Sequence, residues 1–255
     1  MIPYNGIDLD FSLNGKVAVI TGGAAGIGHA TAKFFVEKGV KVVLADLSPN
    51  VGQIAKELGG QAIGVEGNVT DQAFSKAVIE AATKAFGQVD ILVNSAGIAI
   101  LEAAKDTSVD SWNKTIDVNL SASFFMAQAI GGYMIENGIK GSIVNLASQA
   151  GVIALDKHVA YCASKGAIIS MTQVLALEWG RHGIRVNAVS PTVVLTELGH
   201  KAWDGPVGDA FKSQMPSERF AQPEEIAACV GFLCSRAAAM ITGHNLLIDG
   251  GFTIK

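Results

Sequence analysis

The chain has 255 residues, of which 49% are hydrophobic and 16% are charged. This composition allows a sizeable buried core and excludes an intrinsically disordered chain. The formal net charge of −4 gives no reason to expect nucleic acid or an anionic membrane surface as a partner. We therefore expect a globular protein whose partner is a small molecule.

The three cysteines, Cys162, Cys229 and Cys234, stand outside any CxxC pair or histidine cluster. This pattern favours core thiols in a reducing cytoplasm over a disulfide or a metal site. No apolar run approaches the ~20 residues of a membrane span. The first ten residues lack the basic flank and apolar run of a signal peptide and indicate a short extension before the first strand. We expect a cytoplasmic protein without a bound metal.

Short, nearly continuous apolar runs recur along the chain, as in strands buried on both faces of a parallel sheet. Amphipathic segments separate them, and such repeated units build a doubly wound sheet with right-handed crossovers. The predicted strands are residues 17–21, 41–45, 61–65, 91–94, 142–146, 185–189 and 245–248. The predicted helices include residues 27–38, 71–86, 111–135, 160–181 and 223–234.

No linker, composition break or short-period repeat divides the chain. We therefore predict one α/β domain over residues 1–255, doubly wound and of Rossmann type, with a seven-stranded parallel sheet flanked by helices. The regular alternation fails at residues 197–222, which we expect to be irregular. Because long irregular insertions are often functional, we interpret this segment as a mobile flap over a substrate site.

A glycine-rich segment, TGGAAGIG at residues 21–28, follows the first predicted strand and opens the first helix. Its glycines permit a sharp turn and let the backbone approach a pyrophosphate. Unpaired N–H groups at the helix N-terminus then face the phosphates. In this context the motif predicts a dinucleotide site. The predicted contacts in this segment are Gly22, Ala25, Gly26, Ile27 and Gly28.

Asp46 ends the second predicted strand, 18 residues after Gly28. A carboxylate there can accept hydrogen bonds from both hydroxyls of an adenosine ribose, and its charge would repel the 2′-phosphate of NADP. Its neighbours Ala25 and Leu47 offer no compensating cation. The predicted cofactor is therefore NAD, with Leu47 among its contacts. A solvated aspartate at a strand end is the alternative interpretation.

Tyr161 and Lys165 open a predicted helix and lie four residues apart, on one helical face. Tyrosine is a poor base at neutral pH because its pKa is near 10. A cation ~4 Å away at an effective dielectric of ~20 is worth roughly 4 kcal/mol, or about three pKa units. We therefore expect Lys165, helped by an oxidised nicotinamide ring, to make Tyr161 a usable general base. Ser148 follows a strand and can hydrogen-bond the reacting oxygen.

Taken together, these features resemble the short-chain dehydrogenase/reductase family, over residues 16–252, and in particular its NAD-dependent sugar-alcohol and polyol dehydrogenases. The order of the motifs along the chain supports the resemblance. These motifs are the glycine turn at 21–28, Asn68-Val69, residues 94–97, Asn119, Ser148, Tyr161 with Lys165, residues 191–196 and residues 249–251.

The resemblance implies that hydride passes between nicotinamide and a secondary alcohol or its ketone while Tyr161 moves the hydroxyl proton. It implies that Asn119 holds a water linking Lys165 to solvent, and that Lys165 binds the nicotinamide ribose. The implied catalytic residues are Asn119, Ser148, Tyr161 and Lys165. The other implied cofactor contacts are Tyr161 beside Lys165, Asn68 and Val69 at the adenine, Asn94, Ala96 and Gly97 along the cofactor, and Pro191, Val194 and Thr196 near the nicotinamide.

Three positions depart from the family pattern. Asn68 stands where an aspartate is usual, which weakens an adenine contact, and Ser95 replaces the second asparagine of the usual Asn-Asn-Ala-Gly. Thr192 replaces the usual glycine after Pro191, so we expect a stiffer backbone beside the nicotinamide. None of these departures touches the proton-transfer residues.

Gln149 and His158 flank the predicted catalytic residues, and both can donate and accept hydrogen bonds, as a polyhydroxylated substrate requires. We expect oxidation of a polyol or vicinal diol to a hydroxyketone. A surface histidine at position 158 and a solvated loop at the flap are the alternatives. The residues predicted to face the substrate are Ser148, Gln149, His158, Tyr161 and Trp203, with Thr192 beside them.

Two other functions are compatible with the fold. A 3-oxoacyl-thioester (acyl carrier protein) reductase commonly favours NADPH and needs a basic patch, whereas Asp46 and the acidic balance argue against both. A non-catalytic NAD-sensing protein would not need Ser148, Tyr161 and Lys165 intact. The helices at residues 103–135 and 160–181 carry more apolar surface than one sheet face covers. By resemblance, we expect a homotetramer.

Overall fold

Seven parallel strands form one sheet in the order β3-β2-β1-β4-β5-β6-β7. The structure is a computed structural model that describes residues 10–59, 61–197, 199 and 203–255. The predicted sheet and all seven predicted strands are confirmed, with strand ends that differ by at most two residues. The strands are β1 (Val17–Thr21), β2 (Lys41–Asp46), β3 (Ala62–Glu66), β4 (Ile91–Asn94), β5 (Ser142–Leu146), β6 (Arg185–Pro191) and β7 (Asn245–Ile248).

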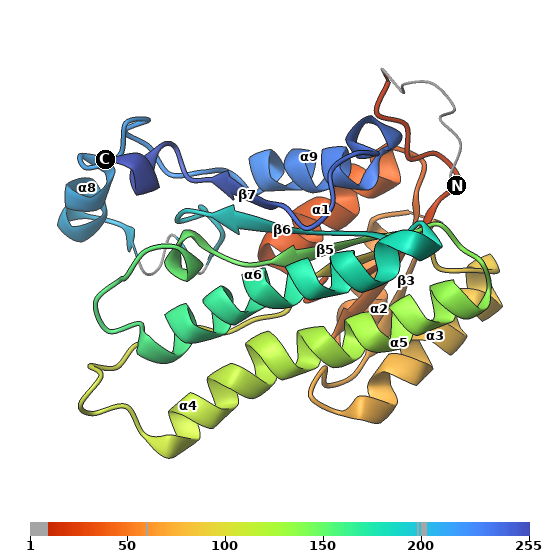
Figure 1. Cartoon of the computed structure of the whole chain (residues 1–255), viewed down its shortest axis with the longest axis horizontal. Coiled ribbons are helices and arrows are strands. Elements are labelled where there is room, and N and C mark those ends of the chain that lie inside the picture. Colours follow the sequence, from red (N-terminus) through yellow and green to blue (C-terminus); the bar gives the residue numbers. More distant parts are fainter. Residues whose placement is uncertain (1–9, 60, 198, 200–202) are drawn as a thin grey trace.

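Helices cover both faces of the sheet and make three layers (Figure 1). One face carries α1 (Gly26–Glu37), α2 (Val51–Glu57) and α9 (Pro223–Cys234). The other carries α3 (Gln72–Phe86), α4 (Val109–Ile116), α5 (Ala122–Glu136) and α6 (Val159–Trp179). The described residues contain no helix with the length and apolarity that a membrane span requires.

The core is divided by the sheet into two clusters, one under each helical layer. In β1, Ala18 and Ile20 point into the cluster under α1, whereas Val19 points into the cluster under α5. This alternation explains why the strands are almost continuously apolar, since both faces of each strand are buried. Strand order reverses between β1 and β4, and the crevice at such a switch point is where sheets of this kind bind ligands.

The predicted helix at residues 111–135 is wrong in one respect, because it is not continuous. A π-helical turn, Asp117–Ser121, separates α4 from α5 and contains the buried Asn119. Short π turns within helices are rare and frequently occur at functional sites. Periodicity could not detect this turn, since one added residue changes the hydrophobic pattern very little.

The segment at residues 197–222 is also more regular than predicted, because it contains the helix α8 (Pro206–Lys212). Gly205 turns the chain with a φ of 86°, and Pro206 then takes the first helical position, where a missing N–H costs nothing. Phe211 of α8 stacks on Phe252 at 4.5 Å between ring centroids, which fixes the helix to the C-terminal residues. α8 accordingly lies near the C-terminus (Figure 1). The predicted N-terminal extension and flap residues 198 and 200–202 lie outside the described residues.

Candidate active site

Ser148 and Tyr161 meet at the carboxyl edge of the sheet. Ser148 follows β5, and its oxygen accepts a hydrogen bond from the backbone N–H of Ala150 at 3.1 Å. Its hydroxyl also hydrogen-bonds the phenol of Tyr161, which lies in the first turn of α6. This hydrogen bond lowers the pKa of Tyr161, as expected when the serine hydroxyl donates to the phenol oxygen. The two hydroxyls that the sequence predicts to act together are therefore in contact.

Lys165 is buried one turn further along α6, with 5% of its surface exposed. Its Nζ donates a hydrogen bond to the carbonyl oxygen of Leu146 at 2.6 Å and lies 5.6 Å from the centre of the Tyr161 ring. Burial lowers the pKa of Lys165 to about 8, because an ammonium ion loses its hydration there. The lysine therefore remains mostly charged at pH 7.

The predicted effect of Lys165 on Tyr161 is wrong for the protein's own groups. Burial raises the pKa of Tyr161 above its usual value of 10.0, and the hydrogen bond from Ser148 opposes that rise only in part. The prediction counted the attraction of the cation and left out the cost of removing the phenolate from water. The protein's own side chains therefore leave Tyr161 protonated at neutral pH.

Asn119 lies beside the catalytic residues, and its side chain is fully engaged in hydrogen bonds within the protein. Its Oδ1 accepts from the N–H of Ile98 at 2.8 Å, while its Nδ2 donates to the carbonyl of Ile98 and to Ser164 Oγ. Ser164 in turn donates to the carbonyl of Tyr161 at 2.7 Å. The carboxamide is thus occupied by protein partners, so a water held by Asn119 would have to use its main-chain carbonyl.

The glycine-rich turn has the close backbone approach that a pyrophosphate site requires. A Cβ on Gly22 would lie 2.9 Å from the backbone N of Ala96, and its φ of +64° favours glycine. A Cβ on Gly28 would overlap the carbonyl oxygen of Gly22. Because these glycines carry no side chains, they leave the N–H groups in the first turn of α1 uncovered. These residues, with Ala25 as N-cap and Ile27 in the first turn, fit a bound dinucleotide.

Asp46 lies at the end of β2, next to the glycine turn. One carboxylate oxygen accepts from the N–H of Ala24 at 3.0 Å, and the other accepts from the N–H of Ser48 at 2.9 Å. These bonds hold the carboxylate at the edge where an adenosine ribose would lie. Leu47 beside it is 68% exposed and brings no cation.

The remaining predicted cofactor residues lie along the same edge, but several are already engaged. Asn68 is exposed, and its Oδ1 accepts from the N–H of Thr70, so the family's adenine contact is weakened further. Asn94 is buried and its Nδ2 donates to the carbonyl of Ser123 and to Asn145, while its Oδ1 has no hydrogen-bond partner among the described residues. Val69 packs on the core near α3.

Gly97 lies beside the side chains of Asn119 and Lys165. A Cβ on Gly97 would be 3.3 Å from Asn119 Oδ1 and 3.6 Å from Lys165 Nζ. Pro191 ends β6 and pairs with Ile248. Val194 pairs with Ala221, and Thr196 accepts from the N–H of Gly199 at 3.1 Å. Ala96 donates its N–H to the hydroxyl of Thr21, which joins the ends of β1 and β4.

Gln149 and His158 lie close to the catalytic hydroxyls. Gln149 is 2% exposed, and its Oε1 has no hydrogen-bond partner among the described residues. The ring of His158 is 6.0 Å from that of Tyr161, and its Nδ1 lies 2.5 Å from the carbonyl oxygen of Asp156. Because a carbonyl only accepts, Nδ1 carries a proton, and Nε2 of the neutral ring is an acceptor.

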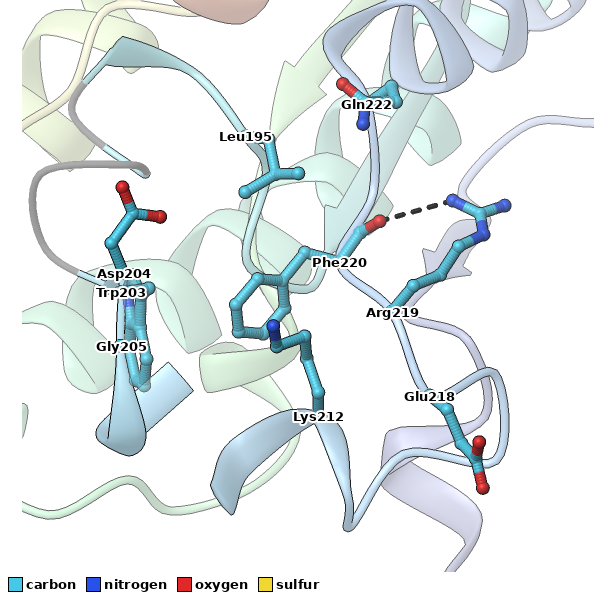
Figure 2. A pocket seen from close by; sticks show the side chains of 9 residues that line it. All are labelled: Leu195, Trp203, Asp204, Gly205, Lys212, Glu218, Arg219, Phe220 and Gln222. Atoms are coloured by element: carbon cyan, nitrogen blue, oxygen red, sulfur yellow. Dashed lines mark hydrogen bonds between the residues drawn. The ribbon is translucent and has the colours of Figure 1, made fainter. Parts of the chain in front are cut away.

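Trp203 lies elsewhere, in the aromatic cluster around Phe211 and Phe220. With Phe220 it borders a cavity of about 410 Å³ between α8 and the chain at residues 218–222 (Figure 2). Among the described residues that line this cavity are none of the four other predicted substrate residues. The structure therefore does not bring Trp203 into one cavity with Ser148, Gln149, His158 and Tyr161.

Sequence reasoning missed Thr21 and Ser164. The Thr21 hydroxyl accepts the N–H groups of both Ser95 and Ala96, and Ser164 links Asn119 to α6. Both lie inside motifs that were recognised, but the motif spacing does not show which way a hydroxyl points. Among the described residues, no group of three or more His, Cys, Asp or Glu side chains is placed to hold a metal ion.

A family model described as "Enoyl-(Acyl carrier protein) reductase" matches residues 22–253, and solved structures described as short-chain dehydrogenases share the fold. The chain belongs to the short-chain dehydrogenase/reductase family. A structure of a short-chain type dehydrogenase/reductase from Mycobacterium marinum has a TM-score of 0.91 and 33% sequence identity, covering 96% of this chain and 98% of that one.

Two relatives in the family are considerably more similar in sequence. An "NAD-dependent glycerol dehydrogenase" from Listeria innocua is 53% identical over 253 residues, covering 99% of each chain. A "D-threitol dehydrogenase" from Mycolicibacterium smegmatis is also 53% identical, covering 98% of this chain and 97% of the relative. Both relatives are named for polyol substrates.

The burial of Lys165 predicts a stability that depends on pH. The pKa of Lys165 is lower in the folded chain, about 8, than the ordinary 10.5, so the unfolded chain binds more protons between these values. The free energy of unfolding therefore rises with pH across that window. Replacing Lys165 by methionine should stabilise the protein at pH 7 by about 1–3 kcal/mol, after the lost bond to Leu146 is counted.

Urea unfolding at pH 7 and pH 9.5 measures this difference, which should shrink at the higher pH. The control is Lys105→Met, since the Lys105 side chain is 84% exposed, and it should change stability little at either pH. A Lys165→Met protein that is less stable than the wild type by the same amount at both values would contradict the argument.

Proposed function

We propose that this chain is an NAD-dependent dehydrogenase that interconverts a secondary alcohol of a polyol or small diol and its ketone. The proposal rests on the contact between Ser148 and Tyr161, with Lys165 buried one turn away. The glycine-rich turn at residues 21–28 lies on the same edge of the sheet. The two 53% identical relatives support a polyol substrate. They give no support to the 3-oxoacyl-thioester reductase alternative.

Tyr161 moves the proton in this proposal. The hydroxyl of Ser148 orients the reacting oxygen and favours the phenolate form of Tyr161, while Lys165 lies 5.6 Å from the centre of the phenol ring. Proton exchange with solvent would pass from Lys165 to a water held by the main-chain carbonyl of Asn119. Bound NAD⁺ would supply the hydride acceptor and a positive ring that adds to the electrostatic effect of the lysine.

Gln149 and His158 are proposed to bind the other hydroxyls of the substrate. The unpartnered Oε1 of Gln149 and the Nε2 of His158 are both acceptors, so they suit hydroxyl donors. Trp203 is proposed to approach the substrate from the flap at residues 197–222. We also propose that residues 1–255 act as one cofactor-binding and catalytic domain, in the cytoplasm, where the free cysteines of the described chain stay reduced.

Replacing Tyr161 by phenylalanine should abolish turnover while leaving NAD binding intact. The change removes one oxygen and keeps the ring, so the proton acceptor is lost without a cavity. We expect kcat to fall by about 10²–10⁴-fold, as for loss of a general base. The measurements are kcat with a polyol panel and the NAD dissociation constant by calorimetry. Full turnover by the variant would refute the assignment of Tyr161.

Replacing Asp46 by asparagine should weaken the preference for NAD over NADP by about tenfold or more, because the charge that repels a 2′-phosphate is removed. The measurement is the ratio of kcat/KM for the two cofactors. Asp110→Asn is the control, since Asp110 is an exposed residue of α4 far from β2 in the chain. An unchanged ratio in Asp46→Asn would show that another group sets cofactor choice.

We propose that the protein is a homotetramer. Val174 and Leu177 on α6 are 52% and 80% exposed, and an apolar helix face of this kind is typical of a protein contact. Sedimentation equilibrium should give four times the mass of the chain, and Leu177→Glu should lower it by placing charges in the contact. A wild-type monomer at micromolar concentration would contradict this proposal.

A further inference from the structure

Thr192 carries a buried hydroxyl without a partner. The residue is 7% exposed, and its Oγ1 has no hydrogen bond among the described residues. Its backbone N–H donates to the carbonyl of Ile248 at 3.1 Å, so the main chain continues the pairing of β6 with β7. A buried polar group without a partner is costly, and native proteins keep few of them. The Thr192 hydroxyl is therefore a candidate hydrogen-bonding group for a ligand.

Thr192 directly follows β6, and its backbone pairing with Ile248 continues the strand's alternation of faces by one residue. Side chains alternate along a strand, so Ala188 and Thr192 lie on one face while Val189 lies on the other. Ala188 packs with Ile168 of α6, whereas Val189 belongs to the cluster under α1 and α9. Thr192 thus lies on the face that α6 covers, the helix that also carries Tyr161.

The neighbouring strand ends in the catalytic serine. β5 and β6 are adjacent and pair through Leu146 and Val189, so their carboxyl ends lie side by side. Beyond β5 come Ser148 and Gln149; beyond β6 comes Thr192. Gln149 Oε1 is a second buried polar atom without a partner at this edge. Two adjacent strand ends therefore each present an unsatisfied polar side chain beside the catalytic hydroxyls.

We propose that Thr192 determines substrate specificity by hydrogen-bonding a second hydroxyl of the substrate. Ser148 and Tyr161 already serve the reacting hydroxyl, so the Thr192 oxygen is left for another one, which it can bind as donor or acceptor. A site with such a group rejects an analogue that lacks the matching hydroxyl, since the buried group then stays unpaired. The inference deepens the proposed function and rests on it.

Two substrate pairs test the proposal: glycerol with 2-propanol, and 2,3-butanediol with 2-butanol. Within each pair the carbon skeleton and the secondary alcohol are the same, and the hydroxyls differ. Thr192→Val keeps the shape and removes the hydroxyl. It should lower kcat/KM for the polyhydroxylated member by about tenfold or more and change the monohydric member little, so that the ratio falls. Thr192→Ser, which keeps the hydroxyl, should retain most of the ratio.

Thr115→Val is the matched control for removal of a buried threonine hydroxyl, because Thr115 is fully buried and bonds only within α4. It should leave the ratio unchanged. An unchanged ratio in Thr192→Val, or an equal loss for both members with a raised KM for NAD⁺, would overturn the role of Thr192 alone. A wild type that oxidises none of the four alcohols with NAD⁺ would overturn the proposed function and this inference with it.

Discussion

The ammonium group of Lys165 lies in a nearly dry interior, and the elements around it are arranged to allow that. A carbonyl at the end of β5 accepts a hydrogen bond from this ammonium group, so the strand must end within reach of α6. Gly151 lets the turn after Ser148 approach α6 so closely that a Cβ would lie 2.8 Å from the main chain of Lys165. Because the turn carries Ser148 and the helix carries Tyr161, the contact between these two residues depends on the same packing.

The π-helical turn at Asp117–Ser121 is the second element of this arrangement. It breaks the helical hydrogen bonding near Asn119 and directs that side chain at the loop after β4 and at Ser164. The Ser164 hydroxyl in turn donates a hydrogen bond to the carbonyl of Tyr161. The loop that would follow a bound cofactor and the helix that carries the acid–base residue are thereby joined by side-chain hydrogen bonds. This explains why an energetically unfavourable turn persists within a helix.

The sheet could be predicted from the sequence because strands buried on both faces leave a strong signal, as residues 91–94 and 142–146 illustrate. The motifs also predicted which residues lie at the carboxyl edge, since motif order follows strand order. The π turn, α8 and the pKa of Tyr161 could not be predicted in this way. A π turn adds one residue to the pattern, α8 depends on contact with Phe252, and the tyrosine's pKa depends on how much water its hydroxyl loses.

Unpartnered polar atoms show where the fold has not been optimised for stability. Gln149 Oε1 and Thr192 Oγ1 lie at adjacent strand ends beside Ser148, and each leaves a polar atom without a partner in the protein. An apolar residue of similar shape at either position would remove that cost. A polar ligand that completes their hydrogen bonds accounts for the presence of both side chains at this edge. Binding then stabilises the folded chain by an amount that rises with the logarithm of ligand concentration over Kd, so the same two side chains couple substrate recognition to stability.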